Sequence, residues 1–238
     1  MRILIILPTY NEAVNIMLLM PELMKLPAWV EVCVVDDNSP DNTGVLADEW
    51  AAKTTRVHVI HRVGKQGLGT AYVAGFRYAL AQGYDAALTM DADFSHHPKY
   101  IPTMIAALEQ ADLVIGSRYV AGGAVLYPWH RRMLSRISNM VARWVLGLKV
   151  HDCTAGFRLY RASALSQVRL DDIRSNGYSF LVELLMQVQA AGARVAEVPI
   201  VFEDRQYGVT KISTREIFRG VETVGRLWWG RARRTVRK

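Results

Sequence analysis

Short apolar runs alternate with amphipathic stretches through the first half of the chain. The apolar runs are rich in Val, Ile and Leu, and they lie at 3–7, 31–35, 57–60, 86–90 and 113–116. The stretches with helical periodicity lie near 12–25, 42–53, 70–82 and 98–109. Strand–helix alternation with continuously apolar strands is typical of a mainly parallel sheet covered by helices on both faces. The pattern therefore predicts an α/β fold.

The second half of the chain begins with a strong amphipathic helix pattern over 129–148. One side of that helix carries apolar residues, namely Met133, Ile137, Met140, Val141, Trp144 and Leu148. Arginines lie on another side, at Arg132, Arg136 and Arg143. Arginine opposite an apolar, Trp-containing side fits a helix that lies on a membrane surface. Periodicity alone favours the alternative, an ordinary helix that packs its apolar side into the core.

The remaining C-terminal residues predict further strands and a last helix. Residues 193–203 indicate a strand or a pair of strands broken at Pro199, and a helix is expected from about Thr214 to Trp229. We find no internal repeat and no low-complexity linker, so the whole chain is expected to form one domain.

Composition agrees with a globular domain of 238 residues, 51% hydrophobic and 21% charged. Two cysteines, Cys33 and Cys153, offer no disulfide framework, which favours a reducing compartment. No run reaches the length of about 18 apolar residues that a membrane span needs. The N-terminus is too short and lacks the small-residue cleavage site of a signal peptide, so it is expected to be the first strand.

The net charge of +7 is concentrated at the C-terminal end. Residues 211–238 hold nine Lys or Arg and two Glu, so they account for the whole charge, and the rest of the chain is neutral. A basic end suggests nucleic acid, an anionic membrane surface, or simply a solvated terminus. The chain has no recognisable nucleic-acid recognition module, which argues against the first.

Polar clusters follow three of the predicted strands, at 8–12, 36–41 and 91–93. In parallel sheets ligands bind beyond the carboxyl ends of the strands, so the three clusters are expected to meet at one edge. Asp91 and Asp93 place two carboxylates directly after a buried strand. Mg²⁺ prefers such oxygen ligands and often shares them with substrate phosphates. Two Asp after a strand also form turns and helix caps, so this segment alone does not establish a metal site.

Seven segments together make the chain recognisable. They stand, in order, at 8–12, 35–41, 67–71, 90–98, 116–119, 154–158 and 204–211. With these segments the chain resembles the family 2 glycosyltransferases of GT-A fold, and within them the dolichol-phosphate (polyprenol-phosphate) mannosyltransferases whose catalytic subunits lack transmembrane helices. The resemblance covers residues 3 to about 218. The Ser-His-His-Pro continuation at 95–98 and the Asp-Arg-Gln-Tyr-Gly-Val-Thr-Lys segment at 204–211 are its most diagnostic parts.

The resemblance implies the layout of the chain and its partners. It implies one GT-A domain over 1–218, with a nucleotide-sugar half to about 118 and an acceptor half from about 119, followed by a basic, Trp-containing tail at 219–238. The implied substrates are GDP-mannose and a membrane polyprenyl (dolichyl) monophosphate, with Mg²⁺ or Mn²⁺ as cofactor and no nucleic acid. Such an enzyme would be peripheral on the cytoplasmic face of a membrane, with room for a separate membrane-anchoring protein. A membrane substrate also favours the surface interpretation of 129–148.

The resemblance also assigns site residues. The nucleotide-sugar site would comprise Pro8, Tyr10, Glu12, Val35, Asp37, Asp91, Ala92, Asp93, Arg118, Arg205 and Lys211. The catalytic residues among them would be Asp93, Arg118, Arg205 and Lys211. The metal would be held by Asp91, Asp93 and Ser95, where Ser95 has a shorter reach than the Gln of some relatives. The acceptor phosphate would be bound by Arg131 and Ser135, which are neighbours on a helix surface.

Two histidines beside the carboxylates, His96 and His97, are expected to shape the turn before Pro98 and not to bind the metal, because imidazole suits softer ions. A lipid monophosphate is already anionic near neutral pH, so we expect no dedicated general base and inversion by a single displacement. Two alternatives stay open. One is a glucosyl or aminosugar transferase that uses a UDP donor. The other is a non-catalytic nucleotide-binding subunit of a membrane complex, against which the intact site residues argue.

Overall fold

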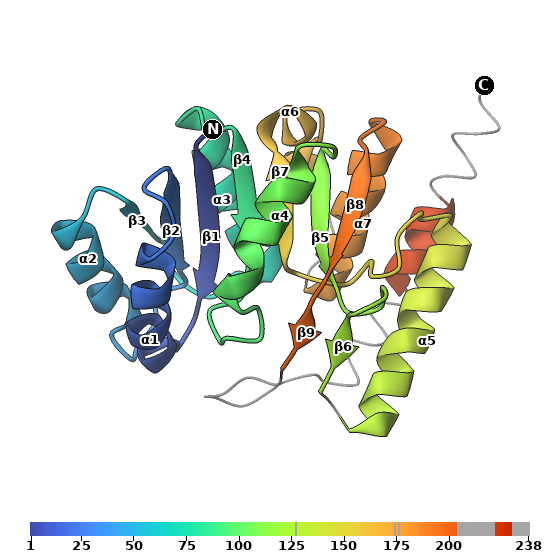
Figure 1. Ribbon diagram of the computed structural model, residues 1–238, viewed down its shortest axis with the longest axis horizontal. Coiled ribbons are helices and arrows are strands. Elements are labelled where there is room, and N and C mark those ends of the chain that lie inside the picture. Colours follow the sequence, from blue (N-terminus) through green and yellow to red (C-terminus); the bar gives the residue numbers. More distant parts are fainter. Residues whose placement is uncertain (127, 174, 176, 204–221, 230–238) are drawn as a thin grey trace.

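The computed structural model describes residues 1–126, 128–173, 175, 177–203 and 222–229 (Figure 1). Within these ranges a single twisted sheet runs through the molecule, with helices in front of it and behind it. This arrangement confirms the α/β fold that the alternation of apolar and amphipathic segments predicts.

The main sheet has seven strands in the order β3-β2-β1-β4-β7-β5-β8. Their bounds are β1 Ile3–Thr9, β2 Val30–Asp36, β3 Val57–His61, β4 Ala86–Thr89, β5 Leu113–Ser117, β7 Arg158–Arg161 and β8 Val195–Pro199. All neighbouring pairs are parallel except those of β7, which runs antiparallel between β4 and β5. The expected mainly parallel sheet is therefore confirmed, with one antiparallel strand inserted.

Helices cover both faces of this sheet. Their bounds are α1 Ala13–Met24, α2 Thr43–Lys53, α3 Leu68–Ala81, η1 Pro98–Tyr100, α4 Ile101–Leu108, α6 Ala162–Leu165, η2 Leu170–Asp172 and α7 Tyr178–Ala190. Successive side chains of a strand point to opposite faces. Accordingly Leu4 and Ile6 of β1 join a core cluster that contains Phe76 of α3 and Leu184 of α7. The alternate residues of β1 join a second cluster with α1 and α4.

The first four helices and all five N-terminal strands lie where the sequence predicts them, within a few residues. Residues 193–203 form β8 and, after Pro199, the short strand β9 (Val201–Phe202), which pairs with β6 (Ala124–Val125) in a second sheet. The sequence pattern predicts neither β7 nor α7. β7 is four residues long with an arginine at each end, which gives no strand signal on its own.

Helix α5 (Trp129–Leu146) runs along one side of the domain (Figure 1). Its buried residues are Asn139, Ala142 and Leu146. Its apolar side is exposed, with Trp129 at 71% and Trp144 at 86% of their full accessibility, and Met133, Ile137, Met140 and Val141 are exposed as well. The expectation from periodicity alone, a core-facing helix, is therefore wrong, because the apolar stripe points outward. Of the residues predicted for the apolar side, only Leu148, just past the helix, is buried.

A further helix occupies 222–229, within the segment where the last helix is expected; residues 214–221 lie outside the described ranges. Leu227 of this helix joins the core, and Arg226 donates to Glu183 of α7 at 3.1 Å. Trp228 and Trp229 are exposed.

None of the helices in the described ranges is both long enough and apolar enough to cross a bilayer.

Candidate active site at the carboxyl edge of the sheet

The strand register brings the three polar clusters together. Thr9 at the end of β1 pairs with Asp36 at the end of β2, and Ile6 of β1 pairs with Thr89 at the end of β4. The antiparallel β7 starts at the same edge, because its first residue, Arg158, pairs with Thr89. The clusters at 8–12, 36–41 and 91–93 therefore share one edge of the sheet, as predicted, and the loop before β7 joins them.

The turn after β4 holds two carboxylates in fixed positions. The buried Asp93 accepts hydrogen bonds through Oδ1 from the Ser95 backbone N–H at 3.1 Å and from the Ser95 hydroxyl at 2.5 Å. Phe94 between them has φ of 64°, in the left-handed region, which closes this turn. The half-buried Asp91 accepts at Oδ1 from the Tyr72 hydroxyl at 3.2 Å. Asp93 is thus oriented by Ser95, two residues on, and Asp91 by Tyr72, which lies 19 residues earlier and which sequence reasoning alone does not pair with it.

The two histidines shape this turn, as expected. His96 is buried, stacks on Phe157 with 5.1 Å between ring centroids, and accepts the Asp91 backbone N–H at Nδ1 over 2.9 Å. Burial lowers the pKa of His96. Because Nδ1 accepts the Asp91 N–H, its 3.7 Å approach to an Asp91 oxygen is not a hydrogen bond. His97 accepts the Lys99 backbone N–H at 3.1 Å and so caps η1.

The donor atoms of this turn suit a hard divalent cation. Asp91 and Asp93 supply carboxylate oxygens, and the Ser95 hydroxyl adds a third oxygen beside Asp93. In the described part of the chain, no group of three or more His, Cys, Asp and Glu side chains gathers into a complete metal site. Two carboxylates with few other protein ligands fit Mg²⁺ or Mn²⁺, since such ions often take their remaining ligands from substrate phosphates and water.

The adjacent aspartates at the end of β2 have different surroundings. Asp36 builds the turn by accepting from the Ser39 hydroxyl at 2.5 Å and from the Thr9 hydroxyl at 3.1 Å. Asp37 is buried, and its Oδ1 lies 2.9 Å from Nη1 of Arg62. The two groups form a buried ion pair, but neither of these atoms makes a hydrogen bond. Burial, opposed by Arg62, raises the pKa of Asp37. Buried polar atoms without hydrogen bonds are atoms that a polar ligand can satisfy.

The loop between β3 and α3 borders the same place. Nη2 of Arg62 donates to the Thr70 hydroxyl at 2.7 Å, and Nζ of Lys65 lies 4.4 Å from the ring centroid of Tyr10. Tyr10 is exposed enough to offer a ring face to a planar ligand. Sequence reasoning missed Arg62 and Lys65. The only signal for them is that two cations follow the third strand at the ligand-binding edge.

The other residues assigned to a nucleotide differ in whether their side chains are buried at this edge. The side chains of Val35 and Ala92 are buried in the core, so a ligand would meet their backbone atoms. Pro8 is half-buried, and Glu12 starts α1, where its Oε2 accepts from the Asn15 amide at 2.5 Å.

Arg118, directly after β5, forms a buried two-point ion pair with Asp152. Nε lies 2.6 Å from Oδ2 and Nη2 lies 2.7 Å from Oδ1, while Nη2 also donates to the Thr154 hydroxyl at 2.8 Å. Burial alone would raise the pKa of Asp152, but Arg118 holds that pKa below its ordinary value. Asp152 is a residue that sequence reasoning missed. Its only signal is its place two residues before the 154–158 segment.

The residues assigned to the acceptor lie on α5. Ser135 accepts a hydrogen bond from the Tyr119 hydroxyl at 2.6 Å, and the Tyr119 ring lies 5.3 Å from the guanidinium carbon of Arg118. Arg131 is half-buried one turn before Ser135. The structure thus links Ser135 to Arg118 through Tyr119. Arg205 and Lys211, the remaining assigned cations, lie outside the described residues.

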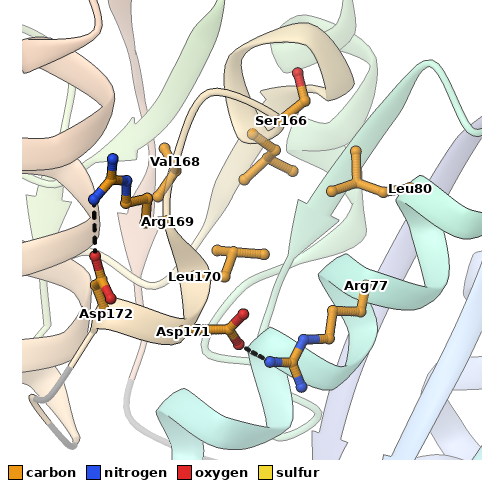
Figure 2. A pocket seen from close by; sticks show the side chains of 9 residues that line it. Arg77, Leu80, Ser166, Val168, Arg169, Leu170, Asp171 and Asp172 are labelled. Atoms are coloured by element: carbon orange, nitrogen blue, oxygen red, sulfur yellow. Dashed lines mark hydrogen bonds and ion pairs between the residues drawn. The ribbon is translucent and has the colours of Figure 1, made fainter.

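An open pocket of about 380 Å³ lies far from these residues, where α3 meets η2 (Figure 2). Its charged rim is paired internally, Arg77 with Asp171 and Arg169 with Asp172. It belongs to the opposite edge of the sheet, where Ala162 of α6 donates to the carbonyl of Asp85 just before β4. The edge of the sheet with Asp37, Asp91 and Asp93, called the carboxylate edge below, is therefore the better candidate for an active site.

Comparison with known proteins gives this edge its context. The model of the family "Glycosyl transferase family 2" matches residues 4–169. An undecaprenyl-phosphate mannosyltransferase of Micrococcus luteus is 46% identical over 235 residues, which cover 98% of this chain and 96% of that protein. A polyprenol monophosphomannose synthase of Mycolicibacterium smegmatis is 44% identical over 245 residues, which cover 99% of this chain and 92% of that protein.

Solved structures show the same fold. Glucosyl-3-phosphoglycerate synthase of Mycobacterium tuberculosis, in complex with Mn²⁺, UDP and phosphoglyceric acid, matches with a TM-score of 0.69 at 19% identity. The match covers 95% of this chain and 78% of that one. The expected GT-A architecture is confirmed, and at this identity the likeness concerns the fold alone.

Proposed function

The chain belongs to glycosyl transferase family 2, among its polyprenyl-phosphate mannosyltransferases, and we propose that it moves mannose from GDP-mannose to the phosphate of a membrane polyprenyl monophosphate. The observation that carries the proposal is the likeness, over nearly the whole chain, to two curated enzymes named for this kind of transfer. The carboxylate edge, with Asp37, Asp91 and Asp93, would supply donor-binding groups for this reaction.

The donor nucleotide would lie along the ends of β1, β2 and β4. Tyr10 offers a ring face, and the buried, incompletely bonded Asp37 offers an acceptor for nucleobase or ribose groups. Glu12 would add a second acceptor, and Pro8, Val35 and Ala92 would meet the ligand mainly through their backbone. Arg62 and Lys65 border this site, Arg62 beside Asp37 and Lys65 beside Tyr10.

Asp91 and Asp93, with Ser95 beside them, would hold Mg²⁺ or Mn²⁺ next to the donor diphosphate. When bound, the ion supplies Lewis-acid stabilisation of the leaving diphosphate. Ser95 also orients Asp93, because its hydroxyl and its backbone N–H both donate to the Asp93 carboxylate. Arg118, Arg205 and Lys211 would bind the phosphates of the donor.

The transfer itself needs no proton to be removed. An anionic oxygen of the polyprenyl phosphate attacks the anomeric carbon, the new C–O bond forms, and the bond to the departing diphosphate breaks, with inversion. His96, the buried imidazole nearest the carboxylates, is unsuited to act as a base, because its Nδ1 already accepts the Asp91 N–H. The protein's work is then to position two anions and offset their repulsion, with Arg131 and Ser135 on the acceptor side.

We infer that α5 is the surface that docks on the cytoplasmic face of the membrane. Its exposed apolar side carries two tryptophans, and arginines flank it, as in helices that lie in the headgroup region. Basic residues of the C-terminal tail would add about 1 kcal/mol each near an anionic leaflet. A separate anchoring protein is compatible with this arrangement and is not needed for it.

The donor assignment is tested by protection against unfolding. In the presence of Mg²⁺, GDP-mannose at about 100 times its own Kd is expected to add about 2.7 kcal/mol to the free energy of unfolding, which is a rise of roughly 5 to 10 °C in Tm. UDP-glucose and UDP-N-acetylglucosamine at the same concentration serve as comparison ligands and are expected to give less than a third of that rise. Equal or greater protection by a UDP-sugar would overturn the GDP-mannose assignment in favour of the UDP alternative.

The membrane assignment is tested on the exposed side of α5. The double variant Met140→Glu, Trp144→Glu is expected to bind anionic vesicles at least about 10-fold more weakly, since each large apolar side chain contributes about 1.5–3 kcal/mol when buried. Vesicle cosedimentation measures the binding, and Tm should change little because both side chains are exposed. Val45→Glu, at an exposed apolar position of α2, is the matched control. Unchanged vesicle binding by the double variant would exclude α5 as the docking surface.

A further inference from the structure

One polar side chain of α5 is buried, and it contacts the segment 152–154, whose side chains bind Arg118. Asn139 is only 2% exposed, whereas the other buried residues of this helix are Ala142 and Leu146. A polar group buried on an otherwise apolar contact surface costs free energy unless its hydrogen bonds are made. The partners of Asn139 therefore indicate what it does.

The amide of Asn139 is fully bonded. Its Oδ1 accepts the Cys153 backbone N–H at 2.9 Å, and its Nδ2 donates to the Ser135 carbonyl at 3.0 Å and to the Thr154 hydroxyl at 3.0 Å. The Cys153 N–H can only donate, so the atom that faces it must be the amide oxygen. The chemistry therefore fixes the orientation of the amide and directs its N–H₂ group toward Thr154.

The Thr154 hydroxyl is the point where α5 meets the ion pair of Arg118. It accepts from Nη2 of Arg118 at 2.8 Å and from Nδ2 of Asn139 at 3.0 Å, and it donates to Asp152 at 3.4 Å. One hydroxyl thus joins the helix, the guanidinium and the carboxylate. A second connection joins Ser135 of α5 to Tyr119, the residue after Arg118, whose hydroxyl donates to the Ser135 hydroxyl at 2.6 Å.

We propose that Asn139 is a positioning residue that couples the acceptor helix α5 to Arg118 through Thr154. The inference rests on the proposed function, which places the acceptor phosphate at Arg131 and Ser135 and the donor diphosphate at Arg118. When the acceptor and the bilayer hold α5, Asn139 holds Thr154, and Thr154 holds the guanidinium in place for the donor. Binding of polyprenyl phosphate is then expected to strengthen binding of the donor nucleotide.

The test measures this coupling as a ratio of two affinities. The Kd of GDP with Mg²⁺ is determined by titration in the presence of vesicles with and without polyprenyl phosphate. For the wild-type chain the acceptor is expected to lower that Kd about fivefold or more, the lower end of typical coupling between sites.

Four variants then separate coupling from folding. Asn139→Asp keeps the oxygen for Cys153 but loses the donor to Thr154, and Thr154→Val removes the shared hydroxyl from the other side. Both are expected to bring the ratio to about 1, and the ratio is taken for each variant against its own Kd for GDP without acceptor. Thr154→Ser retains the hydroxyl and should keep the ratio, as should Ser138→Ala, a polar truncation on the exposed side of α5.

The outcomes are decisive. A ratio near 1 in the wild type, or an unchanged ratio in the two disruptive variants, overturns the proposal. If Asn139→Asp fails to fold, Thr154→Val with Thr154→Ser as its control decides. The proposed function is scored separately, by formation of lipid-soluble mannosyl product in the wild type. Loss of the ratio in the variants without any such product would overturn the proposed reaction and leave the coupling standing.

Discussion

Replacing Asp93 with Asn is expected to reduce mannosyl transfer by about a thousandfold, the scale of losing a key electrostatic group in an active site. Asn retains an oxygen that can accept from Ser95, so the turn closed by Phe94 should survive. What is lost is the negative charge that a divalent cation requires beside Asp91. The rate of lipid-soluble mannosyl product at saturating GDP-mannose and Mg²⁺ measures the effect.

Two controls accompany this variant. Asp172→Asn, an exposed carboxylate at the opposite edge of the sheet, is expected to keep full activity. EDTA should abolish activity of the wild type, and added Mg²⁺ or Mn²⁺ should restore it. An Asp93→Asn rate within tenfold of the wild type would contradict the metal assignment. Absence of turnover in the wild type as well would instead favour the non-catalytic nucleotide-binding alternative.

Replacing Asp152 with Ala is expected to destabilise the fold by about 3–5 kcal/mol, because it leaves a buried cation without its counter-charge. The Asp152 side chain is fully buried and the Arg118 side chain is 9% exposed, so water cannot replace the lost partner. Urea denaturation measures the free energy of unfolding. Activity should also fall at temperatures where the variant is still folded, since Asp152 holds the guanidinium by two contacts.

Glu22→Ala is the matched control for this variant. It removes the exposed ion pair of Glu22 and Lys25, which is of similar length at 2.6 Å, and exposed pairs contribute only about 0–1 kcal/mol. A loss of less than 1 kcal/mol in Asp152→Ala would show that the buried pair does not anchor this part of the site.

Local patterns in the sequence locate the polar clusters at the ends of β1, β2 and β4. The apolar runs locate the strands, and the polar clusters that follow them are close in the chain to the strands that position them. Parallel register then brings Thr9 beside Asp36 and Ile6 beside Thr89 without any further information. This is why the meeting of the polar clusters at one edge could be predicted. The hydrogen bonds of Ser95 with Asp93 are local as well, because the two residues are two positions apart.

The partner of Arg118 could not be predicted in the same way. Asp152 is 34 residues away in the chain, and it reaches Arg118 because β7 inserts antiparallel between β4 and β5. The sequence pattern of β7 does not indicate a strand, because an arginine stands at each end of its four residues. Arg158 is fully buried and donates to the backbone carbonyls of Cys153, Ala155 and Leu181, a set of partners that no sequence pattern announces.

Helix α5 shows a different limit. Its periodicity favours an apolar side that faces the core, and this prediction is wrong because only the tertiary arrangement decides which side is covered. Here Asn139 lies inside and Trp144 outside. Arg205 and Lys211 stay predictions from the 204–211 segment, since they lie outside the described residues.

The most direct measurement is the transfer of radiolabelled mannose from GDP-mannose, with Mg²⁺, to vesicles that contain a defined polyprenyl monophosphate. We expect label to enter the organic phase as a mannosyl phospholipid, only when the polyprenyl phosphate is present, and in the anomeric configuration opposite to that of the donor. Label that stays in the aqueous phase, or that enters the lipid from a UDP-sugar in preference to GDP-mannose, would contradict the proposed function.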